Sequence, residues 1–201
     1  MRLGILGGTF DPIHIGHLIV AEEARLRLEL DRVILIPTGR PWLKDEQPLA
    51  TPEHRSAMVE LGIASNPSFA AGRHEVDRGG PTYTVDTMEV LRREQDPSDS
   101  LHFILGLDAL GQFDRWKSPE RILELCDLGI VNRPGFQNTT TLDDQLARFP
   151  QMGAKTTLVN VSRIDISSTE IRERAARGSS FKYLTPESVE AYIHEHGLYR
   201  S

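Results

Sequence analysis

Two histidines three residues apart, His14 and His17, follow a Gly-Gly-Thr-Phe-Asp-Pro segment that begins at Gly7. We expect the two imidazoles on neighbouring faces of the first turn of a helix that runs from about His14 to Leu30. Free backbone N–H groups at a helix start add positive potential, and the glycines let the backbone approach a ligand closely. This arrangement predicts a site for a phosphate that gains negative charge during a reaction. An isolated pair of histidines at this spacing would more often cap a helix or lie satisfied in the core.

A second candidate phosphate site is an Ile-Ser-Ser-Thr-Glu-Ile-Arg segment near the C-terminus. Ser167 with Glu170 three residues later is a capping-box pattern, which predicts a helix start at Ser168. The N–H groups of Ser168 and Thr169 would then be free to hold phosphate oxygens. Arg172 lies one turn further on the same face, where its guanidinium could bind the same anion in bidentate fashion. Alone, this pattern is typical of an ordinary capped helix, but its pairing with the histidine segment favours phosphate binding.

The elements around these two segments follow the order of a parallel α/β sheet. Residues 3–6 indicate a short buried strand, which a loop at residues 9–13 and the first helix connect to a second strand at residues 33–36. Further strands are expected at residues 102–105, 128–131 and 158–161, further helices from Pro52, over residues 84–91, from Pro119 and over residues 168–176 and 186–196, and a loop at residues 135–141.

This order predicts an α/β fold: a doubly wound, Rossmann-like parallel sheet with helices on both faces. We expect one domain over residues 1–201, with a C-terminal helical part from about residue 167. In such folds the substrates meet beyond the carboxyl ends of the strands.

Composition and charge exclude several classes of protein. Hydrophobic residues make up 39% and charged residues 26% of the chain, close to globular averages, so it can bury a core of its own. A net charge of −6 disfavours a nucleic-acid or anionic-membrane partner, so phosphates must be held by a few well-placed cationic side chains. Cys126 is the only cysteine, and no apolar stretch could serve as a signal peptide or span a bilayer, so we expect a cytoplasmic protein.

The first segment resembles the opening of the nucleotidyltransferase superfamily, which shares its His-x-Gly-His element with class I aminoacyl-tRNA synthetases. The resemblance implies that His14 and His17 are catalytic and stabilise charge at the α-phosphate of a nucleoside triphosphate. It also implies that three residues line the phosphate site through their backbone: Gly8, Thr9 and Phe10. The second segment is similar to the box with which this superfamily grips the β- and γ-phosphates of ATP. That similarity implies phosphate contacts for Ser167, Ser168, Thr169 and a catalytic Arg172.

The rest of the chain narrows the resemblance to nicotinate-nucleotide adenylyltransferases, over essentially its whole length. The shared features occur in one order: Gly80-Pro81-Thr82-Tyr83-Thr84 with Thr87, Gly106-Leu107-Asp108-Ala109-Leu110, Trp116, Arg133-Pro134-Gly135 and Gly197-Leu198-Tyr199-Arg200. The resemblance implies ATP and nicotinate mononucleotide as substrates. It also implies Mg²⁺ bound mainly through the phosphates and water, without an assigned protein ligand.

The same resemblance implies roles for single residues. Thr84 and Trp116 would hold the pyridine ring and its carboxylate, and three residues would lie along the adenosine site: Gly106, Asp108 and Arg133. Taken singly, each has an ordinary alternative. Thr84 or Asp108 could cap a helix, Trp116 could belong to the core, and Arg133 could be a solvated loop residue.

Two positions depart from the family pattern. Family members commonly carry Pro-Pro-His-Lys after the second strand, whereas this chain has Leu43 in place of the histidine and retains Lys44 as a candidate ligand of the mononucleotide phosphate. An aromatic residue often follows the tryptophan, whereas here Lys117 does.

Several rival functions stay open at this point. Pantetheine-phosphate and flavin adenylyltransferases share the first and last boxes, and nicotinamide mononucleotide is a close analogue of the expected acceptor. A nucleotide-binding sensor without catalysis is the alternative from a different class. The glycines do not form the Gly-x-Gly-x-x-Gly fingerprint, which argues against a dehydrogenase. No Lys-Met-Ser-Lys-Ser box is present, which argues against a synthetase.

Overall fold

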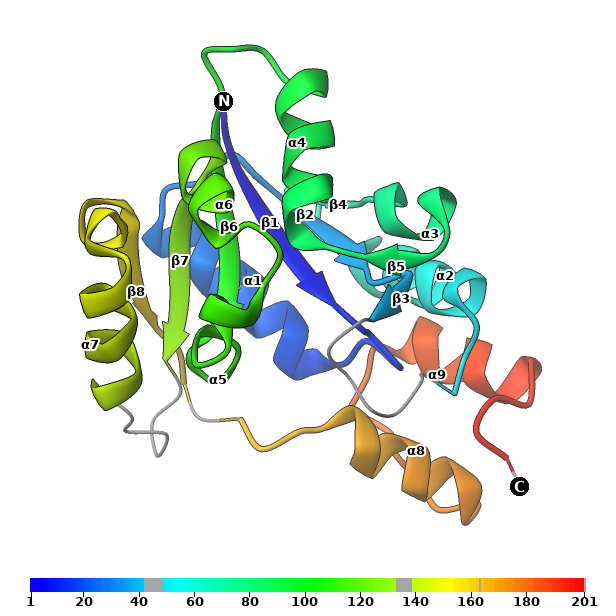
Figure 1. Ribbon diagram of the computed structural model, residues 1–201. Coiled ribbons are helices and arrows are strands. Elements are labelled where there is room, and N and C mark those ends of the chain that lie inside the picture. The colour runs from blue at the N-terminus through cyan, green and yellow to red at the C-terminus, as the bar shows by residue number, and fades with distance from the viewer. Residues whose placement is uncertain (42–48, 133–138, 163, 201) are drawn as a thin grey trace.

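The computed structural model describes residues 1–41, 49–132, 139–162 and 164–200, and Figure 1 shows a layer of strands with helices on either side. A six-stranded sheet runs in the order β4-β2-β1-β6-β7-β8, and every neighbouring pair is parallel. Its strands are β1 (Arg2–Gly8), β2 (Arg32–Pro37), β4 (Phe69–Ala71), β6 (Ser100–Gly106), β7 (Asp127–Asn132) and β8 (Thr156–Asn160). Two short strands, β3 (Arg40–Pro41) and β5 (Pro81–Thr82), pair with each other in parallel as a separate sheet.

The order of the strands reverses between β1 and β6. From β1 the chain adds β2 and β4 on one side, and it then returns to add β6, β7 and β8 on the other. Such a reversal leaves a crevice beyond the carboxyl ends of the two central strands. The predicted doubly wound, Rossmann-like sheet is confirmed, and its crevice lies beside Gly8 and Gly106, the last residues of β1 and β6.

Helices cover both faces of this sheet (Figure 1). They are α1 (Ile15–Arg27), α2 (Pro52–Ile63), α3 (His74–Arg78), α4 (Thr84–Glu94), α5 (Leu107–Leu110), α6 (Pro119–Leu125), α7 (Thr139–Arg148), α8 (Ser168–Ala176) and α9 (Glu187–Glu195), with 3₁₀ turns η1 (Phe113–Arg115) and η2 (Pro150–Lys155). Within the described ranges, no helix has the length and apolar character needed to cross a bilayer.

Each face of the six-stranded sheet packs against its own hydrophobic cluster. One contains buried residues of α1, α2, α8 and α9, and the other contains buried residues of α4, α5 and α6. Strand β6 contributes to both, because alternate side chains of a strand point to opposite faces: Ile104 joins the first cluster, whereas Phe103 and Leu105 join the second. A strand buried on both faces reads as a continuous apolar run, which is the pattern that the sequence shows here.

Local signals located several helix ends well. Helix α8 has the predicted bounds, and α2 begins at Pro52 with the Thr51 hydroxyl accepting the N–H of His54 at 3.4 Å. Helix α1 ends at Arg27 rather than near Leu30. Glu29 has a φ of 51°, so the backbone turns out of the helix there.

The loop predicted at residues 135–141 is wrong at its end, because α7 begins at Thr139. This helix was not among those expected from the sequence. The spacing of Leu142 and Leu146 was the available signal, since both pack on the second hydrophobic cluster. Residues 133–138 lie outside the described part of the chain.

Candidate active site

A cavity of about 440 Å³ lies at the crevice between β1 and β6. Its walls come from the segments after these strands, from the first turn of α1, from the start of α4 and from the segment that follows η1. The fold therefore gathers residues from many separate parts of the sequence. The candidate site residues on its walls are Gly8, Thr9, His17, Thr84, Gly106, Asp108 and Trp116.

The two histidines form a stacked pair at the start of α1. Their ring centroids lie 3.6 Å apart with an interplanar angle of 22°, and His14 is buried whereas His17 lines the cavity. The backbone N–H of His14 donates to Nδ1 of His17 at 3.3 Å. Because Nδ1 then acts as the acceptor, a neutral His17 carries its proton on Nε2. In this tautomer Nε2 is the hydrogen-bond donor of the His17 ring.

Two glycines, one before the pair and one between the two histidines, are required by close contacts. A Cβ on Gly16 would lie 3.0 Å from Nδ1 of His14, and a Cβ on Gly8 would lie 2.8 Å from the Phe10 ring. Phe10 is buried and packs edge-on against His17, with centroids 5.0 Å apart. Phe10 therefore holds the His17 ring in place with its side chain, a contact that the sequence did not indicate.

Asp11, which the sequence analysis did not single out, anchors the loop before the histidines. Its buried carboxylate accepts the N–H of Leu49 at 2.8 Å and of Ala50 at 3.2 Å, and the hydroxyl of Tyr199 donates to it at 2.7 Å. Burial, and then the neighbouring carboxylate, raise the pKa of Tyr199. The two ends of the chain are thus joined at the loop that precedes His14.

A buried arginine, Arg55 on α2, fastens the neighbouring loops. Its guanidinium donates to the backbone oxygens of Thr9 at 2.8 Å, Thr38 at 2.6 Å and Gly39 at 2.9 Å, and its Nε donates to the oxygen of Ala50 at 3.2 Å. Burial lowers the pKa of this group, and Asp11 opposes that shift. Arg55 therefore fixes the segments that follow β1 and β2, and the sequence carried no signal for it.

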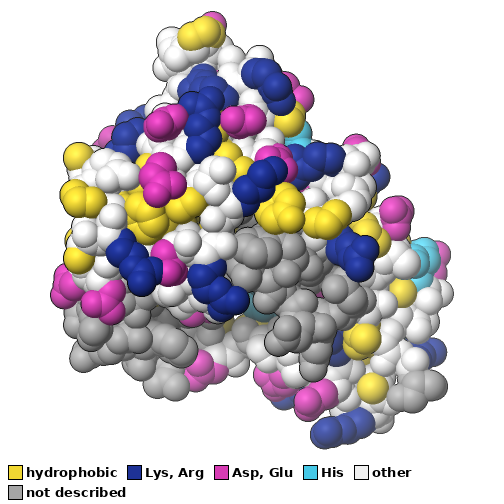
Figure 2. Space-filling model, viewed as in Figure 1, with side chains coloured by type: hydrophobic (Ala, Val, Ile, Leu, Met, Phe, Trp, Pro, Cys, Tyr) yellow, Lys and Arg dark blue, Asp and Glu magenta, His cyan; other side chains and the backbone are white. Residues whose placement is uncertain are grey.

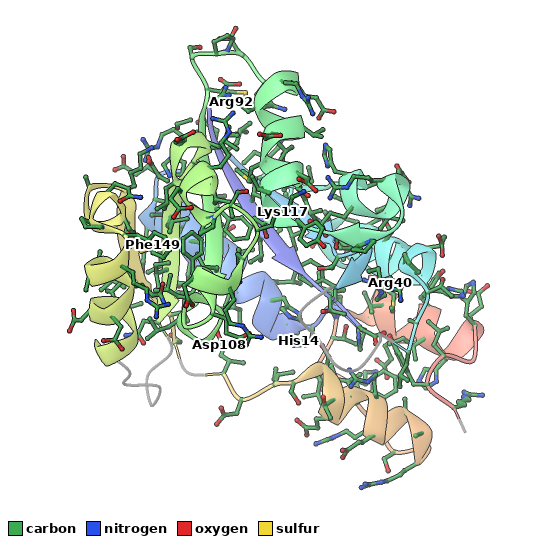
Figure 3. All side chains as sticks on the ribbon, in the orientation of Figure 1. His14, Arg40, Arg92, Asp108, Lys117 and Phe149 are labelled. Atoms are coloured by element: carbon green, nitrogen blue, oxygen red, sulfur yellow. The ribbon has the colours of Figure 1, made fainter. Side chains whose placement is uncertain are left out.

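The second predicted segment docks against the first. The Ser168 hydroxyl donates to the carbonyl of Pro12 at 2.9 Å, and Arg172 Nη1 donates to the carbonyl of Asp11 at 2.9 Å. Two segments more than 150 residues apart in sequence are therefore in direct contact. Figure 3 shows His14 close to the end of β1 that faces α8.

The helix cap and the arginine differ in part from the prediction. The Ser167 hydroxyl accepts the N–H of Glu170 at 3.1 Å, as expected, but the Glu170 carboxylate accepts from Arg174 at 2.6 Å. Arg172 also donates to the Thr169 hydroxyl at 3.3 Å, and both face a second hollow of about 500 Å³ beside Tyr199. The structure thus brings Arg172 to the loop before the histidines but not onto the wall of the first cavity.

The start of α4 forms one wall of the first cavity. Tyr83 is the N-cap, so Thr84 is the first helical residue and its alternative reading as an N-cap is wrong. Buried Thr87 ties this turn to α3, because its hydroxyl donates to Glu75 at 2.9 Å and accepts from Arg78 at 3.0 Å. Burial raises the pKa of Glu75, which also lines the cavity.

Trp116 and Asp108 occupy other parts of the wall. The Trp116 ring packs against Phe103 and Phe113, with centroids 5.9 and 5.5 Å away, and still lines the cavity. Asp108 is exposed, and a Cβ on Gly106 would lie 2.3 Å from its carboxylate, so Gly106 leaves the space that Asp108 occupies. Lys44, Leu43 and Arg133 lie outside the described residues.

Comparisons with known proteins agree on one family. Residues 5–174 match the model of the cytidylyltransferase-like family. The chain is 46% identical over 198 residues to a protein of Roseiflexus sp. (strain RS-1) named "probable nicotinate-nucleotide adenylyltransferase", covering 98% of each chain. It is 45% identical over 200 residues to a protein of Moorella thermoacetica with the same name, covering 99% of this chain and 92% of the relative.

A solved structure has the same fold. The nicotinic acid mononucleotide adenylyltransferase of Plasmodium falciparum, complexed with NaAD, superposes with a TM-score of 0.75 at 22% identity. The match covers 98% of this chain and 97% of that one.

Proposed function

The chain belongs to the cytidylyltransferase-like family, and we propose that within it the chain acts as a nicotinate-nucleotide adenylyltransferase. It transfers AMP from ATP to nicotinate mononucleotide, which gives deamido-NAD and pyrophosphate in NAD biosynthesis. The observation that carries this function is that His17, Thr84 and Trp116 line one cavity. The chain that forms this cavity is 46% identical, over 98% of its length, to a relative of that name.

The reaction proceeds by direct in-line attack. An oxygen of the mononucleotide phosphate forms a bond to the α-phosphorus of ATP, the bond from that phosphorus to the bridging oxygen breaks, and pyrophosphate leaves with the electron pair. The attacking group is already an anion, so no protein nucleophile is required. The protein contributes positioning and charge stabilisation.

Different residues of the crevice position the substrates and stabilise their charge. His17 donates from Nε2 to the α-phosphate as its charge rises, and the stacked His14 holds the His17 ring through the bond to Nδ1. The backbones of Gly8, Thr9 and Phe10 surround the same phosphate. The β- and γ-phosphates bind at the start of α8, to the N–H groups of Ser167, Ser168 and Thr169. The Arg172 guanidinium binds the same phosphates.

The adenosine of ATP lies beyond the end of β6. Gly106 permits close approach, and the exposed Asp108 carboxylate accepts hydrogen bonds from ribose hydroxyls. Arg133 would complete this side, and Lys44 would hold the mononucleotide phosphate.

Mg²⁺ fits the donor set of this cavity. The ion takes oxygen ligands and usually keeps several waters, and the wall offers the Asp108 carboxylate beside the expected phosphates. Asp108 would accept hydrogen bonds from its water ligands. When bound, the ion would neutralise phosphate charge.

The acceptor site at α4 distinguishes a charged substituent on the pyridine ring from a neutral one. Nicotinate and nicotinamide mononucleotides differ in a carboxylate against a neutral amide, and the first turn of an 11-residue helix offers N–H groups to the anion. The Thr84 hydroxyl can add a second donor, and Trp116 provides a face for the pyridine ring.

Replacement of Thr84 by valine should therefore weaken the acid selectively. A donor disappears while the shape stays, and hydrogen bonds to charged groups contribute about 1.5–3 kcal/mol, so we expect kcat/KM for nicotinate mononucleotide to fall by about ten- to a hundredfold. The value for nicotinamide mononucleotide should change little. Thr157→Val, at an exposed position on β8, is the matched control. An unchanged ratio in Thr84→Val would place the carboxylate contact elsewhere.

Replacement of Arg172 by lysine should impair use of ATP. A lysine cannot reproduce the fork that reaches Asp11 and Thr169 and still present a second donor to phosphate, so KM for ATP should rise and kcat fall, each by about tenfold. Steady-state kinetics over a range of ATP concentrations measure both. Arg177→Lys, one turn later and largely exposed, is the control. Wild-type values in Arg172→Lys would make Arg172 a structural residue only.

The function itself is tested by pyrophosphate release from ATP and Mg²⁺ with each acceptor in turn. Nicotinate mononucleotide should be the best acceptor, ahead of nicotinamide mononucleotide and phosphopantetheine. Faster turnover of phosphopantetheine or of nicotinamide mononucleotide would assign a different adenylyltransferase. ATP binding without release of pyrophosphate for any acceptor would identify a sensor.

A further inference from the structure

Lys117, at the position where family members often carry an aromatic residue, lies at the edge of the cavity beside the start of α4. Its Nζ is 2.8 and 3.1 Å from the two carboxylate oxygens of Asp86 and 4.7 Å from the centre of the Tyr83 ring. Figure 3 shows Lys117 next to the lower end of α4, where Thr84 begins the helix. Asp86 on α4 and Tyr83, the N-cap of that helix, therefore hold the ammonium of Lys117, which belongs to the segment after η1.

Of the two partners in this ion pair, Lys117 is the one that lies on the cavity wall within the described residues. Lys117 lines the cavity together with Thr84 and Trp116, whereas Asp86 is not among the described residues of the wall. The cavity is therefore lined by the basic residue of the ion pair and not by the acidic one. Lys117 is also the one lysine or arginine among the described lining residues. The segment between Thr82 and Thr87 contains neither residue type, so a cation at the start of α4 comes from another part of the sequence.

The other acidic and basic groups on the wall come from different elements. His17 lies on α1 and Asp108 lies on α5. Glu75 lies on α3, where its carboxylate accepts from the Thr87 hydroxyl at 2.9 Å. Lys117 is thus the described lining residue that brings a cationic side chain next to the start of α4.

We propose that Lys117 is a specificity-determining residue, whose ammonium, held by Asp86 and Tyr83 at the cavity edge, favours an acceptor ring that carries an anionic substituent. This inference rests on the proposed function and adds a side-chain charge to the backbone donors of α4. Lys117 is about half exposed and already paired, and exposed pairs contribute little, so its share of the preference should be about two- to fivefold. Because such an interaction is screened by salt, the share should shrink as ionic strength rises.

Two variants that break the same ion pair separate this role from a structural one. Lys117→Met removes the cation, so the ratio of kcat/KM for nicotinate over nicotinamide mononucleotide should fall two- to fivefold. Asp86→Asn leaves the cation and releases it from its carboxylate, so the ratio should stay or rise. If the pair only fastens α4 to the segment after η1, both variants should lower activity with both acceptors alike.

The control is Lys182→Met, because Lys182 also lies over a tyrosine ring, with Nζ 5.6 Å from the centre of Tyr183, but at a position that does not line the cavity. A fall in Lys117→Met without a fall in Asp86→Asn, and with no shift in the control, supports the assignment. An unchanged ratio in Lys117→Met, or equal falls in Lys117→Met and Asp86→Asn, overturns it. Failure of the proposed function is distinguishable, because the wild-type enzyme would then show no preference or no turnover of nicotinate mononucleotide.

Discussion

Replacement of His17 by alanine should lower kcat by about 10²–10³ and leave the affinity for ATP within a few-fold of wild type. The reason is that His17 lines the cavity, and the bond from the His14 N–H to its Nδ1 makes Nε2 the donor that we propose binds the α-phosphate as its charge rises. A donor that acts mainly in the transition state contributes to kcat much more than to substrate binding. Single-turnover kinetics and ATP titration, measured on the same protein, separate the two effects.

A second variant and a control sharpen this result. His17→Gln keeps an amide N–H close to the position of Nε2, so it should retain more activity than His17→Ala. His194→Ala, at an exposed ring that stacks on Phe181, should behave as wild type. A His17→Ala enzyme with near-normal kcat would remove His17 from the catalytic assignment, and Phe10 packing would then be its main role.

Local chemistry explains why so much of the fold and site could be predicted. The strand at residues 3–6 is apolar because both faces are buried, and the serine at Ser167 caps α8 through its own hydroxyl. These are interactions between residues close in sequence, so their signals are visible in a short window. The catalytic candidates His14 and His17 likewise belong to one turn, and the structure places them in one stacked pair.

The parts of the site that could not be predicted from the sequence depend on contacts between distant segments. Asp11 could be read as part of a motif, but its partners Leu49, Arg172 and Tyr199 come from three other regions, and no local pattern indicates them. The same holds for Lys117, whose type was evident from the sequence although its pairing with Asp86 was not. Side-chain function in this enzyme is thus set by tertiary contacts that the sequence order does not reveal.

Arg55 is the strongest case of such a contact, and its replacement should have the second large effect. Arg55→Met keeps a long apolar side chain but removes the donors to four backbone oxygens, those of Thr9, Thr38, Gly39 and Ala50. Each buried acceptor left without a partner costs about 1–3 kcal/mol, part of which the loops recover by moving toward water. We expect a loss of about 3–5 kcal/mol in the free energy of unfolding, and a fall in Tm of about 10 °C.

Activity should fall more than stability alone explains, because Thr9 belongs to the wall of the cavity proposed to hold the α-phosphate. At a temperature where Arg55→Met is still folded, kcat should be reduced about tenfold or more, since small displacements of a phosphate site are costly. Arg55→Lys, which can reach one or two of the four oxygens, should lie between Arg55→Met and wild type. Arg27→Met, at a half-exposed arginine paired with Glu23 on α1, is the control and should change Tm by little. If Arg55→Met unfolds within about 2 °C of wild type and keeps normal kcat, the loops after β1 and β2 are held by other contacts.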